Sequence, residues 1–193
     1  MSYMSDVPVE ITEFAERCEK LRKAGLTEKE LTERIRQDLE AVLEKGFELP
    51  AQYSRPDPDH YVMYPLYISK DGEFCVASAV WGVGQRTPVH GHETWGVVGI
   101  YSGRETERQY EKPTGGPSEL VETGEVTWRP GEVTVCCTTD DDIHEVWSDG
   151  DEPCVGIHVY GANMGEFKRR KYDPMTGEES WFVSTWGPVG VGA

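Results

Sequence analysis

The sequence predicts a mainly β fold, a closed or sandwiched β structure preceded by two α-helices. Apolar residues recur at helical spacing through residues 1–46, whereas from residue 61 short β-rich runs alternate with Gly and Pro. Frequent short strands with regular turns favour a barrel or sandwich over alternating strands and helices. At 193 residues the chain is long enough for one well-packed domain. We therefore expect a single domain, 1–193, with N-terminal helices (1–46) packed on a β-barrel (61–186).

Two helices are expected in the N-terminal region. Asp6 can cap the first, which begins near residue 8. Thr27 and Glu30 have the spacing of a capping box at the start of the second. Each helix is expected to end at a glycine, Gly25 and Gly46 respectively. The expected buried faces comprise Ile11, Phe14, Ala15, Cys18 and Leu21 in the first helix and Leu31, Ile35, Leu39, Val42 and Leu43 in the second.

The β-rich part follows a Pro-rich passage, Tyr53–Asp59, which reads as a loop. The expected strands are short and are bounded by turn residues. They are Tyr61–Ser69, Glu73–Trp81, Thr94–Tyr101, Glu105–Glu111, Glu119–Val121, Glu125–Trp128, Val133–Thr138, Glu145–Trp147 and Cys154–Tyr160, with a final strand at Trp181–Trp186.

Composition excludes several kinds of partner. The formal net charge is -16, so phosphate-bearing partners such as nucleic acids and anionic membranes would be repelled. No apolar run approaches the length of a membrane span, and the N-terminus lacks the features of a signal peptide. The five cysteines are odd in number and form no CxxC pair. We expect a reduced, cytoplasmic protein that is a monomer or a weak homo-oligomer.

The histidines give the clearest functional signal. Only five occur, and four of them are His90 and His92, His144, and His158. On a strand, residues i and i+2 point to the same face, so His90 and His92 would present two imidazoles side by side. A third imidazole from a distant strand would complete a three-nitrogen metal site. Such a site keeps open positions and suits non-haem iron chemistry.

Two segments resemble the motifs of the cupin superfamily. Gly84–His92, with Gly103 beyond it, is similar to the first motif in its glycines and both histidines. Gly124, Pro130-Gly131 and His144 are similar to the second, more loosely. The resemblance implies a double-stranded β-helix, or jelly-roll barrel, with metal ligands inside it.

Most cupins add a carboxylate ligand four or five residues after the paired histidines. Here those positions hold Gly96 and Val97. Glu93 is too close, and on a continuing strand it would point to the face opposite His92. The sequence therefore predicts a neutral three-histidine site.

Over nearly its whole length the chain resembles the cysteine dioxygenase family of thiol dioxygenases. The segments that carry the resemblance are Thr87–His92, Asp142–His144 and Ile157–Asn163. In that family three histidines bind Fe(2+), which implies His90, His92 and His144 here. A His-x-Tyr pair, matching His158 and Tyr160, forms an outer-sphere relay beside the iron. Alternation along a strand independently places His158 and Tyr160 on one face.

Departures from the family pattern refine the subtype. Residues 94–98 offer no thiol for the cross-link found in mammalian-type enzymes, so Tyr160 should be a free phenol. Leu66 aligns near the arginine that holds the substrate carboxylate in cysteine-specific enzymes. The run from Tyr160 to Arg170 resembles the bacterial 3-mercaptopropionate dioxygenase branch, which makes Arg169 the first and Arg170 the second choice for binding a carboxylate. Gly156 stands where many relatives begin the relay with serine.

The expected function is oxidation of a small thiol carboxylate by O2 to its sulfinic acid, with 3-mercaptopropionate as the favoured substrate. Cysteine or another mercapto-acid is an alternative substrate, because such thiols differ by one small group. Two other functions stay open. One is a cupin oxygenase or isomerase acting on a non-thiol substrate with another metal. The other is a non-enzymatic metal-binding cupin that senses a small acid.

Overall fold

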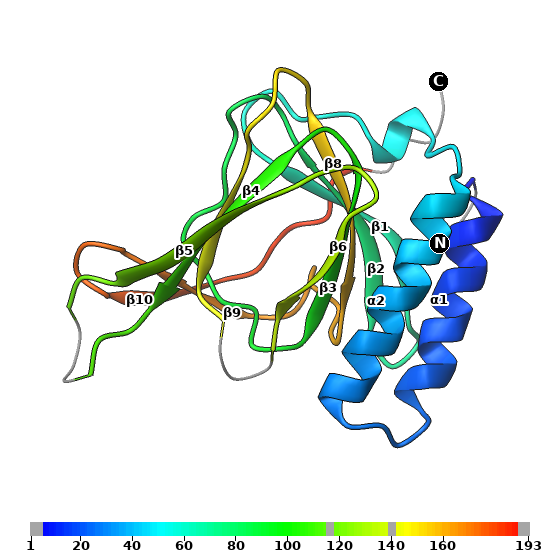
Figure 1. Cartoon of the computed structure of the whole chain (residues 1–193), viewed down its shortest axis with the longest axis horizontal. Coiled ribbons are helices and arrows are strands. Elements are labelled where there is room, and N and C mark those ends of the chain that lie inside the picture. Colours follow the sequence, from blue (N-terminus) through cyan, green and yellow to red (C-terminus); the bar gives the residue numbers. More distant parts are fainter. Residues whose placement is uncertain (1–5, 115–117, 139–141, 189–193) are drawn as a thin grey trace.

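A computed structural model describes residues 6–114, 118–138 and 142–188. It shows a barrel of two facing β layers with two helices against one outer face (Figure 1). This is the mainly β barrel with two N-terminal helices that the sequence predicts.

The helices are α1 (Val9–Arg22) and α2 (Glu28–Lys45). The capping box is confirmed, because the Thr27 side chain accepts from the Glu30 amide and the Glu30 side chain accepts from the Thr27 amide. Gly46 ends α2 as predicted. The prediction that Asp6 caps α1 is wrong. Pro8 occupies the cap position without a side-chain hydrogen bond, and Asp6 has a φ of 83° two residues earlier. None of the described helices is long and apolar enough to cross a membrane.

One layer is an antiparallel five-stranded sheet. Its order is β1 (Val62–Ile68), β2 (Cys75–Trp81), β8 (Cys154–Tyr160), β3 (Gly96–Ser102) and β6 (Val133–Cys137). Both helices cover its outer face (Figure 1). A large apolar cluster forms between the helices and the sheet. The opposite face of the sheet lines the barrel interior with a second apolar cluster.

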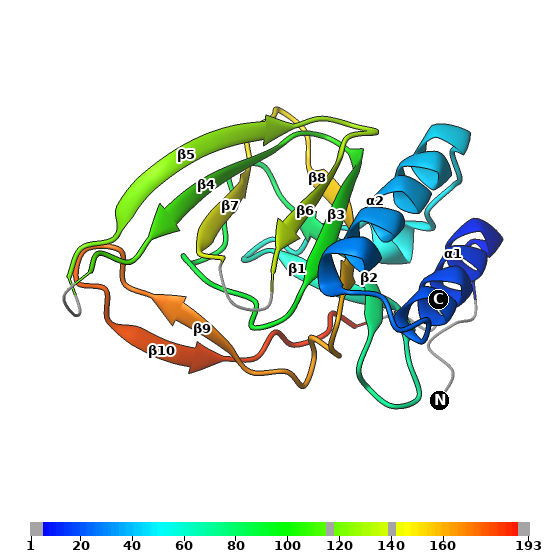
Figure 2. The same ribbon diagram turned by 60° about the horizontal axis from the view of Figure 1, so that its bottom comes forward.

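The facing layer is assembled from two smaller sheets. One has the order β5 (Val121–Trp128), β4 (Glu105–Glu111) and β7 (His144–Ser148), and the other is the hairpin of β9 (Arg169–Tyr172) and β10 (Glu179–Phe182) (Figure 2). The extended segment 86–90 joins them. The Thr87 amide donates to the Val146 carbonyl at 2.8 Å, and the Tyr172 amide donates to the Val89 carbonyl at 2.9 Å. The segment therefore closes the layer that carries the candidate site.

Most predicted strands are present, with three differences. The runs predicted at Glu119–Val121 and Glu125–Trp128 form one strand, β5. The final strand lies earlier than predicted, at Glu179–Phe182, although Trp186 makes a bridge to Met63. Strand β9 was not predicted, because its sequence, Arg-Arg-Lys-Tyr, lacks an apolar alternation. The loop predicted at Tyr53–Asp59 begins with a short 3-10 helix, Ala51–Tyr53, that buries Tyr53.

Candidate metal centre and its cavity

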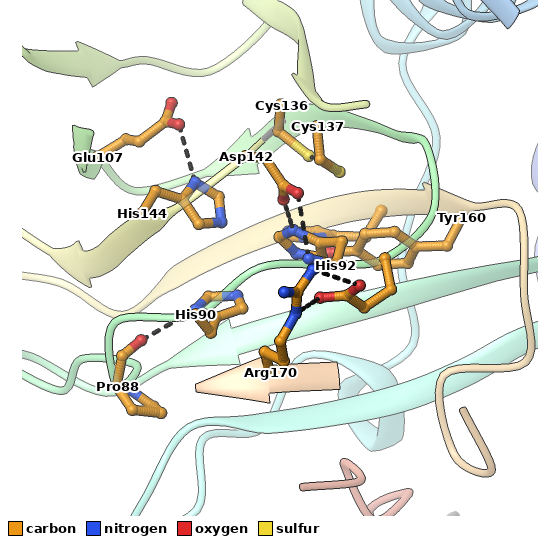
Figure 3. Close-up of polar contacts among 12 residues, drawn as sticks. Pro88, His90, His92, Glu107, Cys136, Cys137, Asp142, His144, Tyr160 and Arg170 are labelled. Atoms are coloured by element: carbon orange, nitrogen blue, oxygen red, sulfur yellow. Dashed lines mark hydrogen bonds and ion pairs between the residues drawn. The ribbon is translucent and has the colours of Figure 1, made fainter. Parts of the chain in front are cut away.

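Three buried histidines converge inside the barrel. His90 ends the joining segment and His144 opens β7, and their backbones exchange two hydrogen bonds of 2.8 and 2.9 Å. His92 follows two residues after His90. One ligand nitrogen from each of the three lies within 4.8 Å of the others (Figure 3). The three-histidine cluster is thus able to hold a metal ion.

The local reason for this convergence differs from the sequence prediction. His90 and His92 were expected on one continuous strand, but His90 makes only isolated bridges and the chain bends at Val89 and again at Glu93 and Thr94. Glu93 adopts a positive φ of 56°, which turns the backbone before β3 begins. Both imidazoles nevertheless face His144, with ring centroids 4.7 and 4.9 Å from its ring.

Each imidazole is oriented by an acceptor at its Nδ1 atom. The Pro88 carbonyl lies 2.9 Å from Nδ1 of His90, Glu107 lies 2.8 Å from Nδ1 of His144, and Asp142 contacts Nδ1 of His92 (Figure 3). A carbonyl only accepts, so Nδ1 of His90 carries the proton and Nε2 keeps its lone pair. The carboxylates favour the same tautomer in the other two rings. Nε2 of His144 is buried and has no partner among the described residues, as a metal ligand requires.

The protonation states of the histidines and of the carboxyl groups beside them suit the binding of a cation. Burial lowers the pKa of His90 and of His92 well below the usual value, so both imidazoles are neutral. Burial alone would raise the pKa of Glu107, but hydrogen bonds from His144 and Trp128 lower it overall. Burial raises the pKa of Asp142 to about 7. Neutral imidazoles backed by carboxyl groups are the surroundings that histidine-bound divalent metals have in proteins.

The ion pair of Glu93 lies outside the cluster. Its carboxylate accepts from Nε of Arg170 at 2.6 Å and from Nη2 at 2.9 Å. The turn at Glu93, and not strand alternation, directs its carboxylate to Arg170. The same pair engages Arg170, the second choice for the carboxylate-binding residue. Arg170 is neutralised by Glu93 and does not line the cavity.

Arg169 lies inside. Its side chain is buried on β9, with a residue exposure of 2%, and it lines the same cavity as the histidines. One Nη donates to the Ser184 hydroxyl, and the guanidinium lies over the Phe182 ring at 4.7 Å. Nε of Arg169 has no partner among the described residues, and no described carboxylate forms an ion pair with it. A buried positive charge without a counter-ion therefore faces the cluster.

The cavity is small and mostly closed. The centres of water molecules can occupy about 30 Å³ of it, which is space for a few such molecules. Its apolar walls are formed by Tyr61, Met63, Ala79, Trp81, Val98 and Val146. Leu66, which aligned near a substrate-binding position, instead packs in the core under the helices.

His158 and Tyr160 both face this cavity from β8, as strand alternation predicts. Nδ1 of His158 lies 2.8 Å from the Tyr160 hydroxyl, and the Tyr160 ring stacks on His92 at 5.3 Å. Burial lowers the pKa of His158 to about 3 and raises that of Tyr160 well above its usual value. The pair is therefore a neutral imidazole beside a protonated phenol.

Position 96 explains how Tyr160 fits. A Cβ at Gly96 would lie 2.9 Å from two Tyr160 ring carbons and would collide with the sulfur of Cys137. A cysteine side chain therefore does reach the neighbourhood of Tyr160, although from β6 and not from the segment after His92 (Figure 3). Cys136 and Cys137 place their sulfurs 2.9 Å apart, and Cys136 lines the cavity.

Sequence reasoning missed several residues of the site. Glu107, Asp142, Glu105 and Trp81 received no role. Glu105 and Glu107 share a strand face, which alternation could have shown. Charged residues occupy both faces of that strand, however, so the pattern does not indicate which face is buried.

Comparisons with known proteins concern the fold. No protein-family model matches the chain. A solved structure from Thermus thermophilus is similar over 60% of this chain and 96% of that one, at 18% identity and a TM-score of 0.46. A Klebsiella pneumoniae protein with a double-stranded β-helix domain is similar over 73% and 93%, at 15% identity and a TM-score of 0.44. An oxalate oxidase bound to the substrate analogue glycolate is similar over 61% and 59%, at 13% identity and a TM-score of 0.46.

Proposed function

We propose that this protein is an Fe(2+)-dependent thiol dioxygenase that oxidises a small thiol carboxylate to its sulfinic acid. The balanced reaction is R–SH + O2 → R–SO2H, in which both oxygen atoms pass to sulfur. Its partners would be this small thiol and O2. Among candidate thiols we favour 3-mercaptopropionate, with cysteine and other mercapto-acids as alternatives.

The observation that carries the proposal is that Arg169 and the three-histidine cluster share one small cavity. A buried guanidinium without a carboxylate partner is costly unless an anion completes it. A substrate carboxylate fits, because guanidinium and carboxylate pair through two parallel hydrogen bonds. The cavity favours a molecule of a few heavy atoms over a peptide or protein thiol.

The residues of the cluster fit a divalent metal that keeps open positions. Imidazole nitrogens suit iron, zinc, copper and nickel alike, so the choice of iron rests on the family resemblance. Bound iron would supply a site where thiolate and O2 meet. Three neutral ligands would leave its full double positive charge to attract the thiolate.

The remaining cavity residues have separable roles. Arg169 holds the carboxylate and thereby fixes the position of the substrate sulfur. Tyr160 donates its hydroxyl proton in a hydrogen bond to the substrate or to oxygen when Nδ1–H of His158 donates to the phenol oxygen. The apolar walls exclude bulk water. This exclusion strengthens the contact of Arg169 with the carboxylate and the hydrogen bond from Tyr160.

The proposal is tested by O2 uptake. The full-length protein is loaded with iron under anaerobic conditions and offered 3-mercaptopropionate, cysteine, cysteamine and mercaptosuccinate. Uptake matched by sulfinate formation is the expected result. If no thiol drives uptake in protein with one iron bound, the dioxygenase proposal fails. Ligand-dependent thermal stabilisation without O2 consumption would then support a small-acid sensor.

The variant Arg169→Leu tests the substrate class. Removing a charge-assisted hydrogen bond costs about 1.5–3 kcal/mol, so kcat/KM for carboxylate thiols should fall roughly 10–100-fold. Cysteamine, which has no carboxylate, should be affected far less. Lys171→Gln is the matched control, because Lys171 is exposed on the same strand and lies outside the cavity. An equal loss for cysteamine and the carboxylates would contradict the role of Arg169.

A further inference from the structure

Three buried polar atoms in the cavity remain unexplained by the proposed function. Nε1 of Trp81, Oε2 of Glu105 and Nε2 of His158 are shielded from solvent and have no hydrogen-bond partner among the described residues. All three residues line the cavity. An unpaired buried polar group costs free energy, so three in one cavity indicate that something joins them.

The three groups gather at the same end of the cavity. A Cβ on Gly156 would lie 2.6 Å from Nε2 of His158, so this nitrogen sits over Gly156. Trp81 pairs with Cys154 in the sheet, and its ring lies 5.6 Å from the His158 ring. Glu105 opens β4 directly after the turn that follows Ser102, whose sheet partner is Val155. Arg169 lines the same cavity from β9, the strand that pairs with β10.

A single water molecule would satisfy all three groups. A buried water needs two to four polar partners and about 10–15 Å³ for its centre, and the whole cavity has about 30 Å³ in which such centres fit. The donors and acceptors of the three groups also match those of a water molecule. Water can accept from the Trp81 N–H and from a protonated Glu105, and can donate to Nε2 of His158.

We propose that Glu105 is a positioning residue that acts on Tyr160 through this water and His158. With Glu105 as donor, Nε2 of His158 accepts, and its Nδ1–H donates to the Tyr160 oxygen. The phenol proton then points to the ligand. Gly156 leaves the space for this water, so the hydrogen-bonded chain runs to β4 instead of ending on a side chain at position 156. The inference rests on the proposed function for its catalytic meaning, but the hydrogen-bonded chain is measurable without turnover.

The protonation state of Glu105 sets the direction of each hydrogen bond between Glu105 and Tyr160. Burial, and then the charge of Glu107, raise the pKa of Glu105 to about 8. Above that pH the carboxylate only accepts, so the water donates to it and accepts from His158. His158 then carries its proton on Nε2, and the Tyr160 hydroxyl turns to donate to Nδ1. Other titratable or charged groups face Glu105 from its own strand and from β6, β7, β8 and β9, namely Glu107, Cys136, His144, Cys154, His158 and Arg169.

The test is the tautomer of His158, read by ¹⁵N NMR of histidine-labelled full-length protein loaded with diamagnetic Zn2+. His158→Gln assigns the signal. In the wild type we expect the proton on Nδ1 at pH 6.5 and a change to Nε2 with a midpoint near pH 8. Glu105→Gln keeps a donor and does not titrate, so the change should vanish. Glu111→Gln, on the exposed end of the same strand, should retain the pH-dependent change of the His158 tautomer.

Two results would overturn the inference. One is a wild-type tautomer that stays constant from pH 6.5 to pH 9, which is decisive even if the variant fails to fold. The other is an unaltered change in Glu105→Gln. Failure of thiol oxidation leaves this reading untouched. If the protein does oxidise a thiol, its kcat should fall above pH 8 in the wild type, and this alkaline loss should be absent in Glu105→Gln.

Discussion

At the scale of single residues, the site depends on the hydrogen-bond acceptor that contacts Nδ1 of each histidine in the cluster. Glu107 receives hydrogen bonds from His144 and from Trp128, and it is almost fully buried. It therefore holds the His144 ring in one orientation and one tautomer. The Pro88 carbonyl does the same for His90, but through a backbone atom that no side-chain substitution removes.

Replacing Glu107 by Gln should weaken metal binding. The loss of a carboxylate partner behind a metal-bound histidine typically costs 10–100-fold in metal affinity, and we expect a loss in this range. Competition with a chromophoric chelator measures it. Glu111→Gln changes the same residue type on the same strand at an exposed position and should leave the affinity unchanged. Equal affinity in wild type and Glu107→Gln would show that the ring is held by packing alone.

The buried Glu105 should also make stability depend on pH. Its pKa is about 8 in the folded protein against an ordinary 4.5. Between these values the unfolded chain releases the proton while the folded chain retains it, so the free energy of unfolding falls as pH rises. The fall is about 1.4 kcal/mol per pH unit, on the order of 4 kcal/mol between pH 5 and pH 8.

Urea unfolding at pH 5 and pH 8 measures this dependence. Since other groups titrate as well, the informative quantity is the difference between wild type and Glu105→Gln. The variant should lose less stability over this range by several kcal/mol. A parallel pH dependence in both proteins would mean that Glu105 is ionised in the fold at neutral pH.

At the scale of elements, His90 is held by segment 86–90, whereas His144 belongs to the regular strand β7. Segment 86–90 is bonded to β7 on one side and, through Val89, to β9 on the other. After His90 the chain turns, and the Gly91 amide donates to the Arg170 carbonyl at 3.0 Å. The ion pair between Glu93 and Arg170 closes the same turn. Strand β9 thus positions His92 from outside the cavity.

Replacing Glu93 by Gln should loosen this turn. The pair is partly exposed, with side-chain exposures of 22% for Glu93 and 32% for Arg170, so its loss should cost about 1 kcal/mol or less. We expect a metal affinity lowered several-fold, less than in Glu107→Gln. Isothermal titration with Zn2+ distinguishes the two. Asp38→Asn, whose partner Arg17 lies on the neighbouring helix away from the cavity, is the control.

The sequence predicts regular elements better than the contacts between them. Strand β8 was predicted with its observed bounds, because a run of apolar residues indicates a buried strand. Strand β9 was missed because its charges are paired or buried only by tertiary neighbours. Glu107 and Asp142, which contact Nδ1 of His144 and of His92, were missed for a related reason. Glu107 lies 37 positions from His144 and Asp142 lies 50 positions from His92, so no local pattern connects them.

At the scale of the whole molecule, the fold does not depend on the metal for its core. Two apolar clusters, one under the helices and one inside the barrel, form from side chains alone. His90 and His144 are joined by backbone hydrogen bonds that need no metal. Neutral imidazoles also do not repel one another when the metal leaves. The metal should therefore stabilise the protein by binding only to its folded form.

Removing the metal should lower the melting temperature without unfolding the chain. A ligand at 100 times its Kd stabilises by about 2.7 kcal/mol, which is about 5–10 °C for a protein of this size. Calorimetry with and without chelator measures the shift, and far-UV circular dichroism should stay unchanged at 25 °C. His92→Ala should melt at one temperature in both conditions, whereas His60→Gln, at an exposed position, should retain the shift. Loss of structure on chelation would show that the cluster organises the barrel, because the joining segment would then pair with β7 only when the metal holds it there.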